Sequence, residues 1–396
     1  MLACYLSYIT SAVTNNLAPL LFVTFHDRFA LSLEQLAFII TLNFGIQIFV
    51  ALIGAKFADR IGYKPLVIAA QAFAALGLFS LGLLPRVLAN AYAGIVISAV
   101  LYAIGSGLME VLISPIIEAL PGDAKASSMS LLHSFYCWGH VLMVMLSTLF
   151  FKVFGTDRWS LLCCLWAILP IVTFLFFFVV PINQLGDGKD ETHMPLRKLF
   201  GVKILWVFMA LMLCSGASEL AMSQWSSFFA ETELGMSKQS ADLLGPCMFA
   251  LTMGLARVLF AALGRRLDIR AGLLVSAVLC IVSYLLAAYA SHPLLALGGC
   301  ALCGFSVGMM WPGVLSLSAK TYPAGGTAMF AILALAGDIG CSVGPETVAR
   351  VSTLLTPGKE ATVKAGLTAA IVFPLFILLA VVLLLLLQKR PGTHRG

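Results

Sequence analysis

The stretch Gly54-Ala-Lys56-Phe-Ala-Asp59-Arg60-Ile-Gly62-Tyr-Lys64 is a short basic turn between two long apolar segments. Glycines allow two helices to turn tightly, and the Asp59 carboxylate can pair with an arginine or cap a helix N-terminus. Basic residues in a short loop also hold that loop in the cytoplasm. The pattern predicts a turn between two membrane spans. It is read either as a purely topogenic charge cluster or as a conformational latch made by Gly54, Asp59, Arg60, Gly62 and Lys64.

The composition around this turn is that of a membrane protein. Of the 396 residues, 61% are apolar and only 11% are charged, whereas soluble domains carry about 25% charged residues. Because apolar runs long enough to cross a bilayer follow one another along the chain, the sequence predicts an all-α membrane protein. Ten cysteines lie in or beside these runs without zinc-type spacing. We therefore expect no metal site and no cofactor.

Twelve apolar runs are long enough to span about 30 Å of hydrocarbon. They are residues 2–26, 33–55, 65–85, 90–120, 127–154, 159–181, 203–231, 238–263, 270–290, 293–320, 326–354 and 362–388. Alternate loops carry unequal positive charge, with 15 lysines and arginines on one side and 8 on the other. The smaller set includes Lys238. The positive-inside rule therefore predicts that both termini are cytoplasmic and that the protein lies in the cell membrane.

A polar segment divides the chain into two similar halves. We expect an N-terminal six-helix bundle over 1–181, a cytoplasmic linker over 182–202, a C-terminal six-helix bundle over 203–388 and a tail over 389–396. Leu120-Pro121-Gly122 and Tyr322-Pro323-Ala324-Gly325 close equivalent spans. Internal repetition of this kind is common in secondary transporters, which bind substrate at mid-membrane between the repeats.

With these residues in view, the turn after Gly54 resembles the loop signature of the major facilitator superfamily. Within that superfamily, the chain is similar to the fucose-permease-like group of sugar–proton symporters. The resemblance is carried by Gly105-x-Gly107-x-x-Glu110 with Pro115, by His133-Ser-Phe135 with Gly139, and by Asn15-Asn16-x-x-Pro19. It implies the major-facilitator fold, with twelve helices in two pseudo-symmetric six-helix bundles, and makes Glu110 the prime proton carrier.

The residues alone also single out Glu110. A carboxyl in the middle of an apolar span is costly and is by default a candidate functional group, and low-polarity surroundings disfavour its charged form. Ser106, Glu110 and Ser114 share one helix face. The alternative is a static carboxyl that is hydrogen-bonded between helices.

Two other acids lie at similar depth, Glu219 and Asp338. Each is read either as a proton-coupling or substrate site or as half of a structural ion pair. Arg257, inside another span, needs an acidic partner, which Glu219, Asp338 or Glu346 could supply.

Polar and aromatic residues near mid-span are candidates for binding a small polar solute. Amides and histidines can hydrogen-bond hydroxyl groups, and tryptophan rings can stack on the apolar faces of sugars. Helix packing is the alternative for each residue. The candidates are Asn15, Asn16, Asn43, Gln47, His133, Tyr136, Trp138, Gln224, Trp225 and Trp311. His140 shares a face with His133 but has no motif support.

The sequence thus predicts a secondary active transporter, with proton-coupled symport of a sugar or similar small polar solute by alternating access. The expected partners are that solute, protons and membrane lipid, with no nucleic acid, and the protein is expected to be a monomer. The main alternative is a proton-driven exporter of amphipathic molecules, whose cavity would be lined by the 27 phenylalanines and 15 methionines. An enzyme is not expected, because no hydrolase or metalloprotease motif is present.

Overall fold

The computed structural model describes residues 1–118, 125–182, 199–263, 268–322, 326–355 and 362–388. The described residues form helices and turns without a strand. Eleven helical segments are long and apolar enough to cross a membrane, and a bent pair supplies a twelfth. This confirms the predicted set of twelve spans, with boundaries shifted by a few residues.

The first half runs from α1 to α8. Its helices are α1 (Leu2–Leu20), α2 (Phe22–Phe29), α3 (Leu33–Ile61), α4 (Tyr63–Val87), α5 (Ala91–Glu118), α6 (Lys125–Phe154), η1 (Thr156–Arg158), α7 (Trp159–Trp166) and α8 (Ile168–Val179).

The second half runs from α10 to α19. It contains α10 (Lys203–Ser223), α11 (Ser226–Thr232), α12 (Lys238–Asp242), the π-turn η2 (Leu243–Cys247), α13 (Met248–Leu263), α14 (Ile269–Tyr289), α15 (Pro293–Val307), α16 (Met310–Thr321), α17 (Gly326–Leu355), α18 (Lys364–Ala369) and α19 (Val372–Gln388). Most of the predicted linker over 182–202 lies outside the described residues, so its boundaries stay a prediction.

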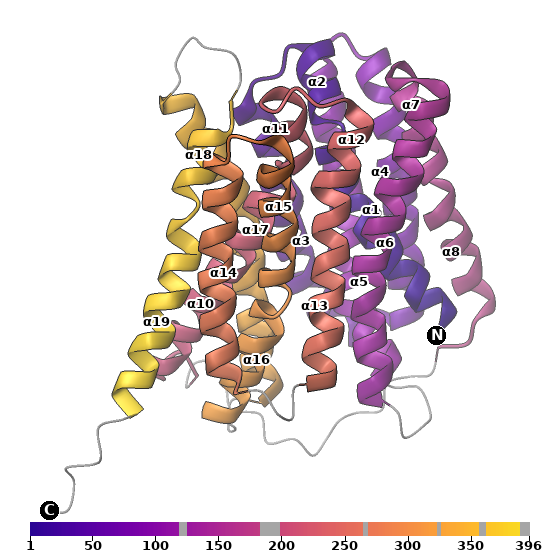
Figure 1. Ribbon diagram of the computed structural model, residues 1–396. Helices are drawn as coiled ribbons and strands as arrows, with labels where there is room; N and C mark the ends of the chain where they lie inside the picture. Colours follow the sequence, from indigo (N-terminus) through magenta and orange to yellow (C-terminus); the bar gives the residue numbers. More distant parts are fainter. Residues whose placement is uncertain (119–124, 183–198, 264–267, 323–325, 356–361, 389–396) are drawn as a thin grey trace, which may run out of the picture.

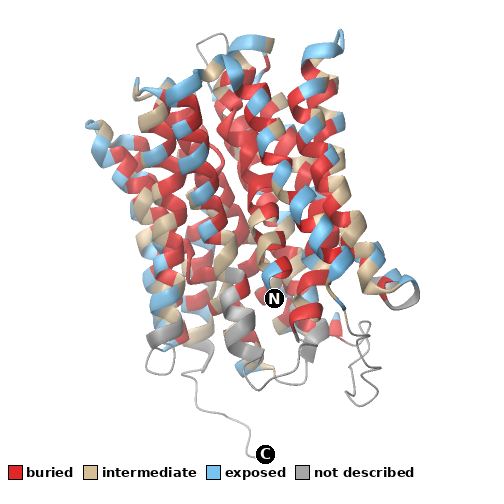
Figure 2. Ribbon diagram, turned by 90° about the vertical axis from the view of Figure 1, so that its right-hand side faces the viewer, coloured by how far each residue is buried: buried red, intermediate tan, exposed pale blue. Residues whose placement is uncertain are grey.

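The two halves pack with matching contacts. In the first half, α1 packs on α6 and α4 packs on α5. The equivalent pairs of the second half are α10 on α17 and α14 on α15. Between the halves, α3 packs on α17 and α6 on α13. Figure 1 places α2, α11 and α18 at one end of the bundle, here called the upper end, and the end of α19 at the other, the lower end. Figure 2 shows buried residues concentrated between the helices.

Several spans are broken at similar depth. α1 and α2 are bent by 42° at Leu21, α10 ends before Gln224, and η2 is a π-turn that contains Pro246. Backbone groups released at such breaks need partners, so broken spans mark places where polar side chains or cavities gather.

The basic turn is tighter than predicted. α3 continues to Ile61 and α4 begins at Tyr63, so the turn consists of Gly62 alone, with φ at 93°. Only glycine adopts this conformation readily. Lys64 Nζ donates to the Phe178 carbonyl at 2.9 Å. The Asp59 and Arg60 side chains lie outside the described residues, so the latch remains a prediction.

Glycines allow α10 and α17 to approach each other closely. A Cβ atom built on Gly340 would lie 1.9 Å from the Leu213 carbonyl oxygen, and one on Gly344 would lie 2.4 Å from that of Ala217. Small residues at a helix contact permit the close packing that holds membrane helices together.

We expect Gly340→Ala to lower the thermal unfolding temperature in detergent, because the added methyl group must push two backbones apart. Overpacking of this kind costs about 1–3 kcal/mol. Gly298→Ala on α15, where a Cβ meets nothing within 4 Å, is the matched control and should leave the temperature unchanged or raise it. Equal unfolding temperatures for the two variants would contradict this packing.

Candidate functional site

An amide cluster joins α1 to α3 in the first half. The Asn15 side-chain oxygen accepts hydrogen bonds from Asn43 Nδ2 at 3.0 Å and from Gln47 Nε2 at 2.9 Å. Asn43 and Gln47 are one helical turn apart and therefore reach the same oxygen. All three residues are buried. The structure brings these three sequence candidates together.

A second amide cluster crosses from one half to the other. Gln224, at the break between α10 and α11, donates from Nε2 to Asn16 Oδ1 on α1 at 3.0 Å. Asn16 Nδ2 donates to the Ala12 carbonyl at 2.9 Å and lies 3.4 Å from the Tyr136 hydroxyl on α6. Three predicted binding residues from three helices therefore meet in the middle of the bundle.

Two amide oxygens in these clusters are buried without a hydrogen-bond partner among the described residues. They are Gln224 Oε1 and Asn43 Oδ1. A small cavity of about 10 Å³ adjoins Asn16 and Gln224 and is also lined by His140, Ser223, Ser227 and Pro246. This volume is close to the smallest cavity volume that can hold one water molecule. The two unpaired oxygens are acceptors that hydroxyl donors could satisfy.

The three tryptophan candidates differ in their surroundings. Trp225 is fully buried, donates from Nε1 to the Pro345 carbonyl at 3.2 Å, and packs against Phe22 with ring centroids 5.3 Å apart. Trp311 packs against Gly337, where an added Cβ would clash with the ring. Trp138 is 39% exposed. Trp138 therefore presents the most open ring, whereas stacking on Trp225 would require its ring to be uncovered.

Glu110 faces the space between the halves. Its side chain is exposed, yet it interacts electrostatically with Tyr8 on α1 and with Asp338 on α17. Those neighbours belong to opposite halves, so the carboxyl faces the interface rather than lipid. The flanking residues on its helix face bond to α1: Ser106 to Thr14 at 2.9 Å and Ser114 to Tyr8 at 3.1 Å. Two predicted proton sites, Glu110 and Asp338, thus lie near each other across the interface.

Glu219 is the partner of Arg257 that the sequence left open. Arg257 Nη2 lies 3.9 Å from Glu219 Oε2, and Nη1 donates to Cys137 Sγ on α6 at 3.3 Å. Arg257 Nε has no partner among the described residues. Glu346 instead pairs with Arg350 at 2.6 Å and accepts a hydrogen bond from Thr41. The side chain of His133 lies outside the described residues, so its role stays a prediction.

Sequence reasoning missed a buried ion cluster at the upper end. Lys238, counted among the loop residues, is only 8% exposed and pairs with Glu231 and Asp242. The signal was present in the sequence: Lys238 and Asp242 are spaced i, i+4, and Glu231 precedes Lys238 by seven residues. This spacing indicates that the charges can pair, but not that the pair is buried.

We expect Arg257→Met to lower the thermal stability of the protein, because it leaves the Glu219 carboxyl without a cation. Breaking a buried ion pair costs about 3–5 kcal/mol. Both side chains are partly exposed and the distance between the charged atoms is long. We therefore expect the free energy of unfolding to fall by about 1–3 kcal/mol. Adding Glu219→Gln should restore part of this loss in a thermal unfolding assay. No recovery in the double variant would contradict a direct pairing.

Comparison with solved structures gives matches over nearly the whole chain. A D-xylose–proton symporter matches with a TM-score of 0.80 and 16% identity, over 96% of this chain and 95% of its own. The xylose transporter XylE from E. coli, in a partially occluded inward-open conformation, gives 0.74 and 14%, over 100% and 98%. The outward conformation of the transporter FucP gives 0.63 and 16%, over 96% and 97%. At these identities the likeness shows the fold.

A comparison with curated protein sequences gave no match. A family model described as the Major Facilitator Superfamily matches residues 2–345. This match covers most of the chain and agrees with the twelve spans, the paired halves and the structural likeness. The chain belongs to the major facilitator superfamily and is a multi-span membrane transporter.

Proposed function

We propose that this transporter carries out proton-coupled symport of a sugar or similar small polar solute, by alternating access between its two halves. We assign the upper end to the outside of the cell and both termini to the cytoplasm, because Lys64, Lys203 and Lys320 of the more basic set lie at the lower end, where α4 and α10 begin and α16 ends (Figure 1). We propose with it the residue roles that this function requires.

The observation that carries the proposal is the hydrogen bond between Gln224 and Asn16. It joins the halves in the buried middle of the bundle, beside a cavity and an unpaired amide oxygen. A solute that accepted and donated hydrogen bonds there would contact both halves at once. Its binding would therefore depend on how the halves are arranged, which is what alternating access requires.

The chemistry of these groups favours a neutral, hydroxyl-bearing solute. The clusters offer amide oxygens, amide N–H groups and the Tyr136 hydroxyl, which together accept and donate hydrogen bonds. Trp138 offers an open ring on the same helix as Tyr136. Sugars present hydroxyl groups and apolar C–H faces, which suit this combination. The xylose–proton and fucose–proton symporters among the structural matches support the same choice.

Glu110 is the proposed proton carrier, with Asp338 and Glu219 as further coupling residues. Glu110 and Asp338 repel each other when both are charged, and they sit on opposite halves. Protonation of either carboxyl removes that repulsion and lets the halves approach at this depth. A proton and a solute would then favour the same rearrangement, which is the requirement for symport.

We expect Gln224→Leu to weaken binding of the transported sugar by at least about tenfold, which corresponds to about 1.4 kcal/mol. Binding is measured by thermal shift with a panel of sugars and nucleosides on the purified protein. The control is Gln71→Leu, because Gln71 is also buried with an unpaired oxygen but bonds only within the first half. If no sugar stabilises the parent protein and amphipathic compounds do, the exporter alternative replaces this proposal.

We expect Glu110→Gln to abolish accumulation driven by a proton gradient in proteoliposomes, because the amide cannot exchange a proton. Exchange of labelled for unlabelled sugar, which needs no net proton movement, should persist. Glu34→Gln, an exposed acid in the first turn of α3, is the control and should keep both activities. Unchanged gradient-driven uptake in Glu110→Gln would refute the coupling role.

A further inference from the structure

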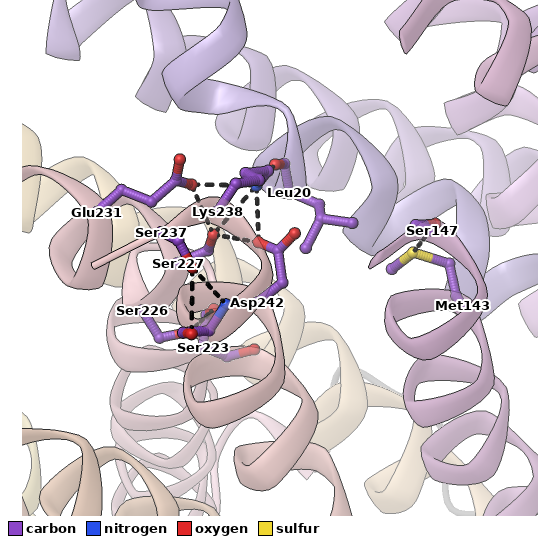
Figure 3. A network of polar contacts seen from close by, with 11 residues as sticks. Leu20, Met143, Ser147, Ser223, Ser226, Ser227, Glu231, Ser237, Lys238 and Asp242 are labelled. Carbon is purple, nitrogen blue, oxygen red and sulfur yellow. Dashed lines mark hydrogen bonds and ion pairs between the residues drawn. The ribbon is translucent and has the colours of Figure 1, made fainter. Parts of the chain in front are cut away.

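A buried ion cluster lies at the upper end of the bundle and consists of Lys238, Glu231, Asp242 and Ser227 (Figure 3). Lys238 is the first residue of α12, and its ammonium lies 2.6 Å from Asp242 Oδ1 and 3.1 Å from Glu231 Oε1. It also donates to Ser227 Oγ at 3.3 Å. All these partners belong to the second half, so they hold the lysine firmly on that side.

One further contact of Lys238 crosses to the first half. Its Nζ donates to the Leu20 carbonyl oxygen. Leu20 is the last residue of α1, directly before the bend into α2. Carbonyl groups at a helix end lack a regular intrahelical partner and are available to outside donors. The broken span thus exposes the acceptor that the lysine uses.

The cluster borders the central cavity through two shared residues. Leu20 and Ser227 both contact Lys238 and both line the cavity that reaches Asn16 and Gln224. Nearby aromatic contacts also cross between the halves, with Phe22 against Trp225 and His26 against Phe228 at 5.9 Å. These contacts therefore join the two halves beside the cavity, on its side toward the upper end.

We propose that the Lys238 cluster is a lock between the halves, which holds the upper end closed through the bond from the lysine to the Leu20 carbonyl. When the halves separate, Lys238 keeps both carboxylates and loses only this one bond. The lock can therefore open without leaving a buried charge unpaired. This inference rests on the proposed alternating access, but not on the proposed solute or on proton coupling.

The charge balance of the cluster determines which variants test it. Two carboxylates face one ammonium, and Asp242 Oδ2 is buried without a partner among the described residues. Lys238→Met alone would leave both carboxylates uncompensated and could impair folding. The double variant Lys238→Met/Asp242→Asn removes the most buried carboxylate along with the lysine and so keeps the lock testable.

The test measures access to the cavity from each side of the membrane. Ser223, which lines the cavity, is replaced by cysteine, and its reaction with a membrane-impermeant thiol reagent is followed in right-side-out and inside-out vesicles. Each variant is also measured without Ser223→Cys, to subtract labelling of the ten natural cysteines. The control is Arg28→Met, because Arg28 pairs with Asp157 at the same end but within one half.

We expect Lys238→Met and the double variant to label at least about fivefold faster than the parent from one side only, and Arg28→Met to label at the parent's rate. The side on which labelling rises is predicted to be the outside, and it reports the orientation of the chain independently. Equal rates for the parent and both lock variants on both sides would overturn the lock. A rise in Arg28→Met as large as in the lock variants would overturn it as well.

Discussion

Polar side chains buried in an apolar helix bundle must find partners inside the protein, and here several find them across the interface between the two halves. Gln224 reaches Asn16, Lys238 reaches the Leu20 carbonyl, and Arg257 reaches Cys137. Each of these contacts joins one half to the other and would break if the halves moved apart at that level. The interface is therefore held by a few directional bonds, in addition to the packing of α3 on α17 and of α6 on α13.

These contacts lie at different depths and have different consequences. The Lys238 cluster is at the upper end, the amide clusters are in the middle, and Glu110 and Asp338 lie further toward the lower end of their helices. The upper contacts are paired and buried, whereas Glu110 is exposed between the halves. This difference in exposure between the two ends agrees with the proposed alternating access. The upper end would be closed, and water would reach Glu110 from the lower end.

Much of the fold could be predicted from the sequence, because membrane thickness fixes the length of an apolar span and few charges are tolerated within it. The polar residues in the middle of the spans could be identified for the same reason, because they stand out in an apolar segment. The partners of these residues could not be predicted, because pairing depends on how helices far apart in sequence are arranged: Glu219 was one of three possible partners for Arg257. The burial of Lys238 was not predicted, because it depends on how the short helix α12 packs against α11. Trp225, expected to be available for stacking, is covered by Phe22 and Phe228.

If the two halves rock about a shared polar centre, the distances between spin labels placed on opposite halves must change at both ends of the bundle. One label pair at the upper end would use the exposed residues Asp157 and Leu354, and one at the lower end Ile61 and Lys320. With saturating sugar and protons, we expect the two label pairs to change in opposite directions, one distance lengthening as the other shortens. Distances that stay fixed at both ends, or that lengthen together, would contradict alternating access by these halves.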